Sequence, residues 1–159
     1  QASDCRAFRH YFPCSTHRRG FLRSGPGCRQ ASDPAYQTEG DCTVTGSYIL
    51  LYRAVYNLVE NAIKYNRPSG SVTVSIHTAE SAVLEVTDTG IGISPENQEK
   101  IFDPFYRVDK SRSRAMGGAG LGLALVSEIA RQHKGQVKVT QSSEKGSTIA
   151  LILPKSTDY

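Results

Sequence analysis

Three groups of residues in this chain have types and spacings that could do chemistry. The first is Asn57, Asn61 and Lys64, which share one face of a predicted helix by the i, i+3, i+4 rule. Two amide oxygens and an ammonium on one face suit an assembly of magnesium and phosphate, because magnesium takes oxygen ligands and keeps phosphates as co-ligands. A solvated polar helix face is the alternative interpretation of the same residues.

The second group is DTGIGI at 88–93, directly after a predicted strand. Asp88 would offer a fixed acceptor at the end of that strand, suited to the exocyclic amine of a base. Gly90 and Gly92 allow the backbone to turn sharply and to approach a ligand closely. An ordinary Asp-Gly turn has the same composition and is the alternative here.

The third group is the glycine-rich segment GGAGLG at 117–122, ahead of a predicted helix. Its backbone N–H groups and the positive helix end could bind phosphate. Neither a Walker P-loop nor a dinucleotide fingerprint fits, because no GK[ST] follows and no strand precedes it. Arg107, Lys110, Arg112 and Arg114 lie just before it and could neutralise a triphosphate. A basic loop ending in glycine is typical of a lid, although Arg112 and Arg114 also fit a solvated basic loop.

The elements that must position these groups are predicted from residue 41 onward. Apolar periodicity indicates helices over 47–65, 94–101 and 120–133, and strands over 72–76, 82–86, 137–139 and 149–153. Ser47 could cap the first helix, and Pro95 stands at the first position of the second. Leu121, Leu125 and Ile129 share one face of the third. This mixture predicts an α+β fold with a mostly antiparallel or mixed sheet covered on one face by helices.

Residues 1–40 differ in composition from the rest. They hold six Arg, no Lys and three acidic residues, and all four Cys lie in the first 42 residues. Frequent Gly and Pro and the lack of apolar periodicity predict an irregular or disordered leader. A zinc site remains open as an alternative, as do disulfides and an Arg-rich nucleic-acid patch; the zinc ligands would come from Cys5, His10, Cys14, His17 and Cys28.

Composition excludes several classes of protein. The 159 residues are 38% hydrophobic, enough for one core, so wholesale disorder is not expected. No run of 18 apolar residues is present, so no transmembrane helix is predicted. The formal net charge is +4, yet residues after 40 hold thirteen basic and twelve acidic side chains and are nearly neutral. The basic leader therefore accounts for most of the net charge, and no nucleic-acid partner is expected.

In combination, the motifs closely resemble the catalytic, ATP-binding domain of bacterial sensor histidine kinases, in the GHKL superfamily. The resemblance covers 47–154, in the expected order: an N box NLVENAIKY (57–65), a glycine box DTGIGI (88–93), an F box FDPFYR (102–107), a second glycine box GGAGLGL (117–123) and a final GST (146–148). It implies a two-layer α/β sandwich, with a mixed sheet of about five strands covered on one face by three helices and a mobile ATP lid. It places the catalytic domain at 41–159.

The resemblance also implies cofactors and site residues. ATP and Mg²⁺ are expected, with Asn61 and Asn57 at the metal. Asn57, Lys64 and Arg107 form the expected catalytic set, since Lys64 and Arg107 would contact phosphate. The remaining expected ATP-binding residues include Tyr65 against the nucleotide, Asp88 at the adenine amino group and Thr148 closing the adenine side; the others are Gly90, Gly92, Ile93, Lys110, Gly118, Gly120, Leu121 and Gly122. Phe102 and Phe105 would anchor the lid by packing.

Asn57 separates this chain from the ATP-hydrolysing relatives of the family that it resembles, such as gyrase-type topoisomerases and mismatch-repair proteins. These place a Glu four residues before the metal Asn, where a carboxylate can activate water. An amide cannot act as that base. Glu60 is one residue before Asn61 and is expected to point elsewhere on the helix. We therefore predict phosphoryl transfer to a protein histidine rather than efficient hydrolysis.

The sequence contains no H-E-x-x-T-P-like run that would mark a phosphoacceptor histidine. His77 and His133 close a strand and a helix and are expected to be structural. The implied partner is therefore a separate dimerisation hairpin carrying that histidine, with a response regulator as indirect partner. The implied location is cytoplasmic, on a membrane-bound sensor. A regulatory ATP-binding module, such as an anti-sigma-type kinase, is the alternative, although such kinases tend to carry Glu at the position of Asn57.

Overall fold

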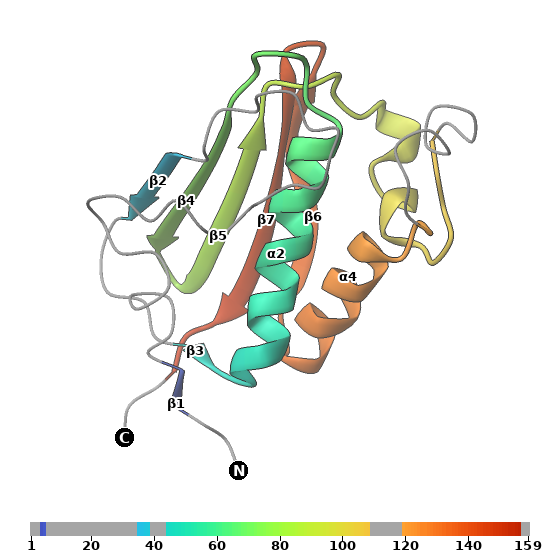
Figure 1. Ribbon diagram of the computed structural model, residues 1–159. Coiled ribbons are helices and arrows are strands. Elements are labelled where there is room, and N and C mark those ends of the chain that lie inside the picture. The colour runs from blue at the N-terminus through green and yellow to red at the C-terminus, as the bar shows by residue number, and fades with distance from the viewer. Residues whose placement is uncertain (1–3, 6–34, 39–43, 109–118, 157–159) are drawn as a thin grey trace.

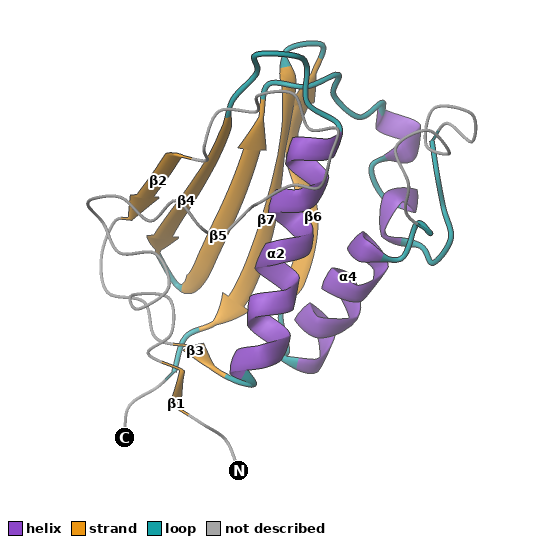
Figure 2. Cartoon of the chain, in the orientation of Figure 1, coloured by secondary structure: helices purple, strands orange, loops and turns teal. Residues whose placement is uncertain are grey.

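The computed structural model describes residues 4–5, 35–38, 44–108 and 119–156, which form a two-layer sandwich. One layer is a five-stranded sheet, and the helices cover one of its faces (Figures 1 and 2). The strand order is β2 (Ala35–Thr38), β4 (Val72–Thr78), β5 (Ser81–Asp88), β7 (Gly146–Pro154) and β6 (Gln136–Ser143). β2 pairs in parallel with β4 and the other neighbours are antiparallel, so the predicted mixed sheet of about five strands is confirmed.

Parts of the predicted irregular leader form strands. Ala35–Thr38 is the edge strand β2, and β1 (Asp4–Cys5) pairs with β3 (Val44–Thr45). The prediction of irregular structure is therefore wrong at these residues. A four-residue edge strand is too short to show a period, and its pairing partner β4 lies more than thirty residues away in the sequence. Most of the residues of the suggested zinc site lie outside the described part of the chain.

The first helix, α2 (Tyr48–Lys64), begins and ends where the sequence predicts. Ser47 occupies its N-cap, but the Ser47 side chain makes no capping hydrogen bond. The start of the helix is held instead by His133, whose Nε2 accepts a hydrogen bond from the Ser47 backbone N–H at 3.0 Å. The Nδ1 atom of His133 lies 2.7 Å from the carbonyl oxygen of Ile129, so the ring connects α2 to the end of the next helix.

The second helix, α4 (Gly122–Gln132), packs against α2 with a different face from the predicted one. Val126, Ile129 and Ala130 are buried, whereas Leu121 and Leu125 are 44% and 37% exposed. The buried stripe still follows helical spacing, but it is rotated by one position because α4 also contacts the sheet through β6 and β7. The short helix predicted over 94–101 is realised as two successive 3₁₀ turns, η1 (Pro95–Asn97) and η2 (Lys100–Phe102).

The core lies between the helices and the inward face of the sheet. The buried side chains of α2 recur every three or four residues, and those of the strands recur every second residue, as a helix on a half-buried sheet requires. None of the described helices is long and apolar enough to span a membrane. The sandwich leaves one end of α2, the loop after β5 and the start of α4 close together.

Candidate functional site

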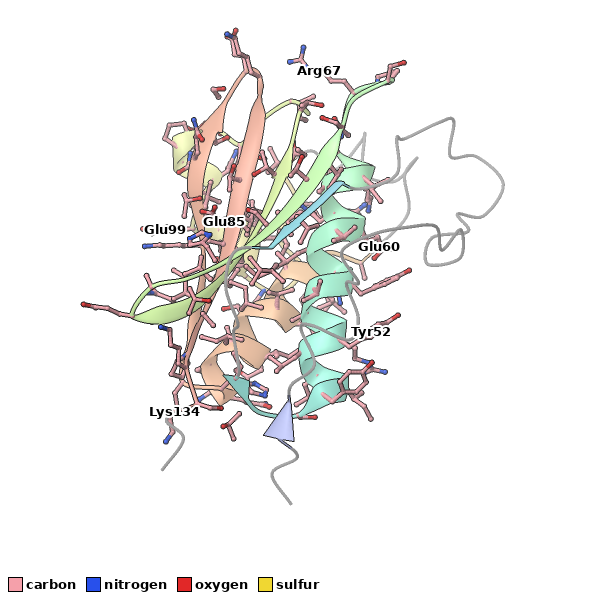
Figure 3. All side chains as sticks on the ribbon, turned by 90° about the vertical axis from the view of Figure 1, so that its left-hand side faces the viewer. Tyr52, Glu60, Arg67, Glu85, Glu99 and Lys134 are labelled. Atoms are coloured by element: carbon pink, nitrogen blue, oxygen red, sulfur yellow. The ribbon has the colours of Figure 1, made fainter. Side chains whose placement is uncertain are left out.

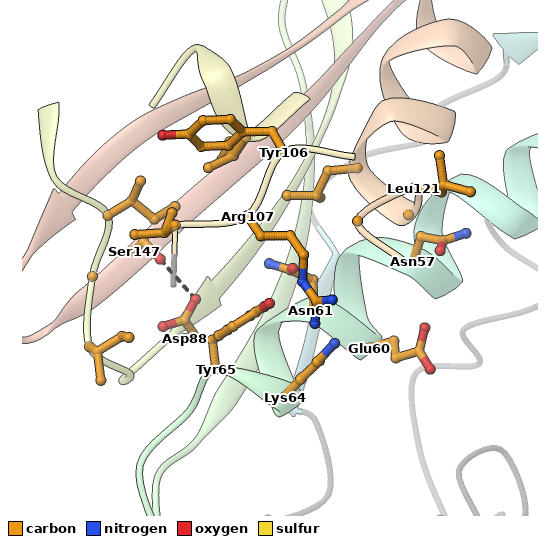
Figure 4. A pocket seen from close by; sticks show the side chains of 18 of the residues that line it. Asn57, Glu60, Asn61, Lys64, Tyr65, Asp88, Tyr106, Arg107, Leu121 and Ser147 are labelled. Atoms are coloured by element: carbon orange, nitrogen blue, oxygen red, sulfur yellow. Dashed lines mark hydrogen bonds between the residues drawn. The ribbon is translucent and has the colours of Figure 1, made fainter. Parts of the chain in front are cut away.

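A cavity of about 610 Å³ lies between α2, the loop after β5 and the N-terminal end of α4 (Figure 4). Its lining includes most of the chemistry-bearing residues predicted from the sequence. Those lining residues are Asn57, Asn61, Lys64, Tyr65, Asp88, Gly92, Ile93, Arg107, Gly120, Leu121 and Gly122. Segments far apart in the sequence therefore meet at one site. Lys110 and Gly118 lie outside the described residues.

One end of the cavity carries amide oxygens from α2. Asn57 and Asn61 are one turn apart, so both reach the cavity from the same helix face. The Asn57 Nδ2 group donates a hydrogen bond to the carbonyl oxygen of Arg53 at 2.8 Å, which orients its Oδ1 atom as an acceptor. A Cβ placed on Gly122 would lie 2.9 Å from that oxygen, so Gly122 leaves room for Asn57 at the start of α4.

Two cations share this end of the cavity. The guanidinium of Arg107 projects toward Lys64 and Asn61 (Figure 4), and its Nη2 atom is buried with no hydrogen-bond partner among the described residues. Burial lowers the pKa of Lys64, and the positive charge of Arg107 lowers it further, while Glu60 acts in the opposite direction. A buried unsatisfied donor beside a second cation is unfavourable unless an anion lies between them. This end of the cavity is therefore suited to a phosphate chain.

The other end presents a buried carboxylate. Asp88 is 7% exposed and ends β5. Its Oδ1 atom accepts a hydrogen bond from the Gly90 N–H at 2.8 Å, and its Oδ2 atom accepts one from the Ser147 hydroxyl at 2.9 Å, drawn as a dashed line in Figure 4. Each carboxylate oxygen keeps a further lone pair for a ligand. The amine of a planar base lying between Asp88 and the apolar side chains that line the cavity would find an acceptor already in place.

Comparisons with known proteins agree with this geometry. Residues 46–157 match the family model described as "Histidine kinase-, DNA gyrase B-, and HSP90-like ATPase". The chain belongs to this ATPase family. It is 49% identical over 113 residues to the sensor-like histidine kinase SenX3 of Mycobacterium tuberculosis, covering 70% of this chain and 27% of SenX3. It is 43% identical to the sensor histidine kinase RppB of Synechocystis, covering 74% of this chain and 26% of RppB.

Solved structures of the ATPase family support the same assignment. The mycobacterial sensor histidine kinase MprB is similar with a TM-score of 0.66 and 30% identity, over 79% of this chain and 84% of that one. Full-length ShkA, solved in complex with AMPPNP, gives a TM-score of 0.69 and 26% identity. The match covers 79% of this chain and 26% of the ShkA chain. The chain corresponds to the ATP-binding catalytic domain of two-component histidine kinases. It spans about a quarter of the length of the curated relatives named above.

Within this ATPase domain, the expectation for Thr148 is wrong. Thr148 does not line the cavity, and its hydroxyl lies 2.9 Å from that of Thr87 on the opposite face of the sheet. Ser147 lines the cavity instead and stands opposite Asp88 in the β5–β7 register. Side chains alternate between faces along a strand, so a shift of one residue changes the face completely. The register in which β5 pairs with β7 is therefore what identifies Ser147.

The two glycines after Asp88 have different roles. Gly92 lines the cavity with φ +75°, and a Cβ there would lie 2.0 Å from the Ser143 carbonyl oxygen. Gly90, which is also among the expected ATP-binding residues, does not line the cavity. A Cβ on Gly90 would lie 2.3 Å from the Tyr65 carbonyl oxygen, so its lack of a side chain brings the loop against the end of α2.

The two phenylalanines of the F box also differ. Phe102 packs against the core, but Phe105 is 71% exposed and has φ +64°, so the packing role expected of Phe105 does not hold. Tyr106 follows it and donates a hydrogen bond from its hydroxyl to Asn97 Oδ1, which ties this segment to η1. The N–H of Phe105 donates to the Gly120 carbonyl oxygen, so the two ends of the lid segment are connected.

Several lining residues were missed by the sequence analysis. Glu60 lines the cavity, against the expectation that it points elsewhere, because the cavity spans a wide sector around the last turns of α2. The others are mostly apolar side chains and small residues with no chemical signature: Ile91, Ser94, Ile101, Tyr106, Val108, Ala119 and Leu123. Only the tertiary packing of the loop and the 3₁₀ turns identifies them.

Proposed function

We propose that this chain binds Mg²⁺ and ATP in the cavity and donates the terminal phosphoryl group to a histidine on a separate phosphoacceptor hairpin. The observation that carries the proposal is the buried Nη2 of Arg107, which lies beside Lys64 and has no hydrogen-bond partner among the described residues, opposite the acceptor Asp88. Cations at one end and a base-recognising carboxylate at the other fit the two ends of ATP. The ATPase domain would be residues 41–159.

The chain's own residues divide the work along the cavity. Asp88 accepts from the adenine amino group, while Lys64 and Arg107 bind the phosphates and stabilise charge that develops on them during transfer. Asn57 and Asn61 would hold the metal ion through their amide oxygens, and the Asn57–Arg53 hydrogen bond orients one of these. Bound magnesium supplies neutralisation of phosphate charge. The N-terminal end of α4 faces the same region and adds a positive dipole.

The reaction proposed is an in-line phosphoryl transfer. The bond between the terminal phosphorus and the bridging oxygen breaks, ADP keeps that electron pair, and an imidazole nitrogen of the hairpin forms the new bond. Asn57 provides no carboxylate to activate water, so transfer is favoured over hydrolysis. A response regulator would then take the phosphoryl group from the hairpin. We propose the cytoplasm as the compartment, because the ATP supply lies there.

The test is phosphoryl transfer in trans. The chain is incubated with γ-labelled ATP, Mg²⁺ and a separately produced hairpin domain of SenX3, and acid-labile phosphohistidine is measured on the hairpin. Label is expected on the hairpin and absent from the chain itself. The Asn61→Ala variant and a hairpin lacking its histidine are the controls, and both should give background label.

Two outcomes would contradict the proposal. A rapid Mg²⁺-dependent ATPase that survives Asn57→Ala would show that the site hydrolyses ATP by another route. Tight ATP binding without transfer to the SenX3 hairpin, or to any other hairpin of the related kinases, would favour the alternative of a regulatory ATP-binding module.

A further inference from the structure

Three segments of the chain meet just outside the end of the cavity that carries Asp88. They are the residues after α2, the loop at 88–93 and the turn between β6 and β7. Figure 3 shows Arg67 at this end of the sandwich and Lys134 at the opposite end. Arg67 does not line the cavity, and none of the motifs in the sequence contains it.

Arg67 joins all three segments. Its Nε donates a hydrogen bond to the Gly90 carbonyl oxygen at 3.2 Å, and its Nη2 donates one to the Glu144 carbonyl oxygen at 2.5 Å. The planar guanidinium can donate to both carbonyls at once, which a single ammonium at the end of a flexible chain does less well. The side chain therefore connects the residues after α2 to the loop and to the β6–β7 turn.

Each of the neighbouring hydrogen bonds involves no more than two of these segments. Asn66 Oδ1 accepts from the Thr89 hydroxyl at 3.1 Å, and Asn66 Nδ2 donates to the Ser71 carbonyl oxygen at 2.9 Å. On the other side of the loop, the Ile93 N–H donates to the Ser142 hydroxyl at 2.7 Å. The first of these bonds joins the loop to the residues after α2, the second lies within those residues, and the third joins the loop to the end of β6, whereas Arg67 contacts both the loop and the β6–β7 turn.

The bridge acts on the two groups that hold Asp88. Gly90 presents its N–H to Asp88 Oδ1 and its carbonyl oxygen to Arg67, so the guanidinium constrains the residue that orients the carboxylate. Ser147, the other donor to Asp88, follows the turn that contains Glu144. Arg67 is thus connected to both oxygens of the Asp88 carboxylate through short chain segments.

We propose that Arg67 is a positioning residue that sets the base selectivity of the nucleotide site by holding the Asp88 carboxylate in place. The inference rests on the proposed function. Adenine offers an amino group to this carboxylate, whereas guanine offers an oxo acceptor at the same position and is repelled. Discrimination therefore depends on where the carboxylate lies, and a loosened loop admits both bases more equally.

The test is equilibrium binding of ATP, ADP and GTP to the wild-type chain and to Arg67→Ala, Arg67→Lys and Arg131→Ala. Arg131 is the matched control, because it is an exposed arginine that pairs with Glu128 on α4 and does not line the cavity. We expect Arg67→Ala to weaken ATP and ADP by the same factor, about fivefold to tenfold, since the net effect of one or two hydrogen bonds is of that order. GTP should change by less than twofold, so that the ATP:GTP ratio falls.

The remaining variants separate positioning from charge and from folding. Arg67→Lys keeps the charge but replaces the planar guanidinium with a single ammonium, so it should recover part of the ATP:GTP ratio, and Arg131→Ala should leave the ratio unchanged. If Arg67→Ala does not fold, the change in the ATP:GTP ratio is measured on Arg67→Lys alone.

Two results would overturn the inference while leaving ATP binding intact. One is an unchanged ATP:GTP ratio in both Arg67 variants. The other is a loss that is larger for ATP than for ADP, which would show that Arg67 acts on the phosphates. If the wild-type chain binds no ATP, the proposed function itself fails.

Discussion

At the scale of single residues, the end of the cavity lined by Lys64 and Arg107 holds two positive charges in an unfavourable arrangement. Lys64 is partly desolvated and lies near Arg107, and both effects lower its pKa from the ordinary value of 10.5. A bound triphosphate would oppose both effects because it places negative charge beside the ammonium. Nucleotide binding should therefore be linked to the protonation of Lys64.

The sign of this linkage is testable. Protonated Lys64 binds phosphate more strongly, so ATP affinity should fall as pH rises through the lowered pKa of Lys64, below 10.5. Binding should then take up protons in the pH range around and just above this lowered pKa, where part of the free protein has lost the Lys64 proton. Calorimetry in two buffers with different ionisation enthalpies measures this uptake. Lys64→Arg is the control, since its charge does not titrate in this range; equal uptake in both proteins would contradict the assignment.

A second prediction at this scale concerns two adjacent hydroxyls. Ser147 donates to Asp88 in the cavity, whereas Thr148 lies on the opposite face of the sheet. Ser147→Ala should weaken ATP binding by about 1 kcal/mol, the usual net value of a hydrogen bond to a buried group, and Thr148→Ala should leave it unchanged. Titration with a fluorescent ATP analogue and competition with ATP compares the two variants. A larger loss for Thr148→Ala would mean that the register is shifted by one residue.

At the scale of elements, the end of α4 contains local strain next to an important contact. The Lys134 N–H donates to the Arg131 carbonyl oxygen and the Gly135 N–H donates to that of Ala130, which is the Schellman pattern of hydrogen bonds. Lys134 occupies the left-handed position of this motif with φ +57°, where glycine is preferred. The preceding residue, His133, accepts from the N–H at the start of α2. The two helices are therefore joined at a strained turn.

Replacing Lys134 should relieve this strain. Lys134→Gly is expected to stabilise the domain by about 0.5–1 kcal/mol, because glycine adopts a positive φ without steric cost. The melting temperature should rise by a few degrees, roughly as this free energy implies for a domain of this size. Lys134→Ala is the matched control: it removes the same side chain but keeps the strain, so it should give no gain. Equal stabilisation by both variants would mean that the side chain itself destabilises the fold.

At the scale of the whole molecule, β7 is an interior strand of the sheet. It pairs with β5 on one side and β6 on the other, and it contacts α4. Leu151 is fully buried on that face, between Leu84 and Val137 in the register, while the next residue, Ile152, lies on the opposite face and is partly exposed. The two residues therefore separate core packing from the outer surface of the same strand.

Truncating them should have unequal effects on stability. Leu151→Ala should cost about 2–5 kcal/mol because it creates a cavity in the core, and Ile152→Ala should cost clearly less. Denaturant unfolding of both variants gives the free energies of unfolding. Equal losses would show that the outer face of the sheet is covered by further packing.

Much of this architecture was predictable because it depends on local patterns in the sequence. The helical period from 48 to 64, the alternation at 72–76 and 82–86, and the position of Pro95 each depend on near neighbours in the sequence. The motif positions around Asn57, Asn61, Asp88 and Arg107 also predicted one site, and the structure brings these residues to one cavity.

Tertiary structure alone decided the features that depend on distant pairing. Strand register placed Ser147 rather than Thr148 beside Asp88, and the packing of α4 on two layers buried Val126 rather than Leu125. Pairing with β4 made a strand of Ala35–Thr38, and the meeting of three segments gave Arg67 its two carbonyl partners. The sequence by itself determined which groups could bind a nucleotide, because residue type and local spacing suffice for that. Their orientation required the fold, because hydrogen bonds between distant segments set it.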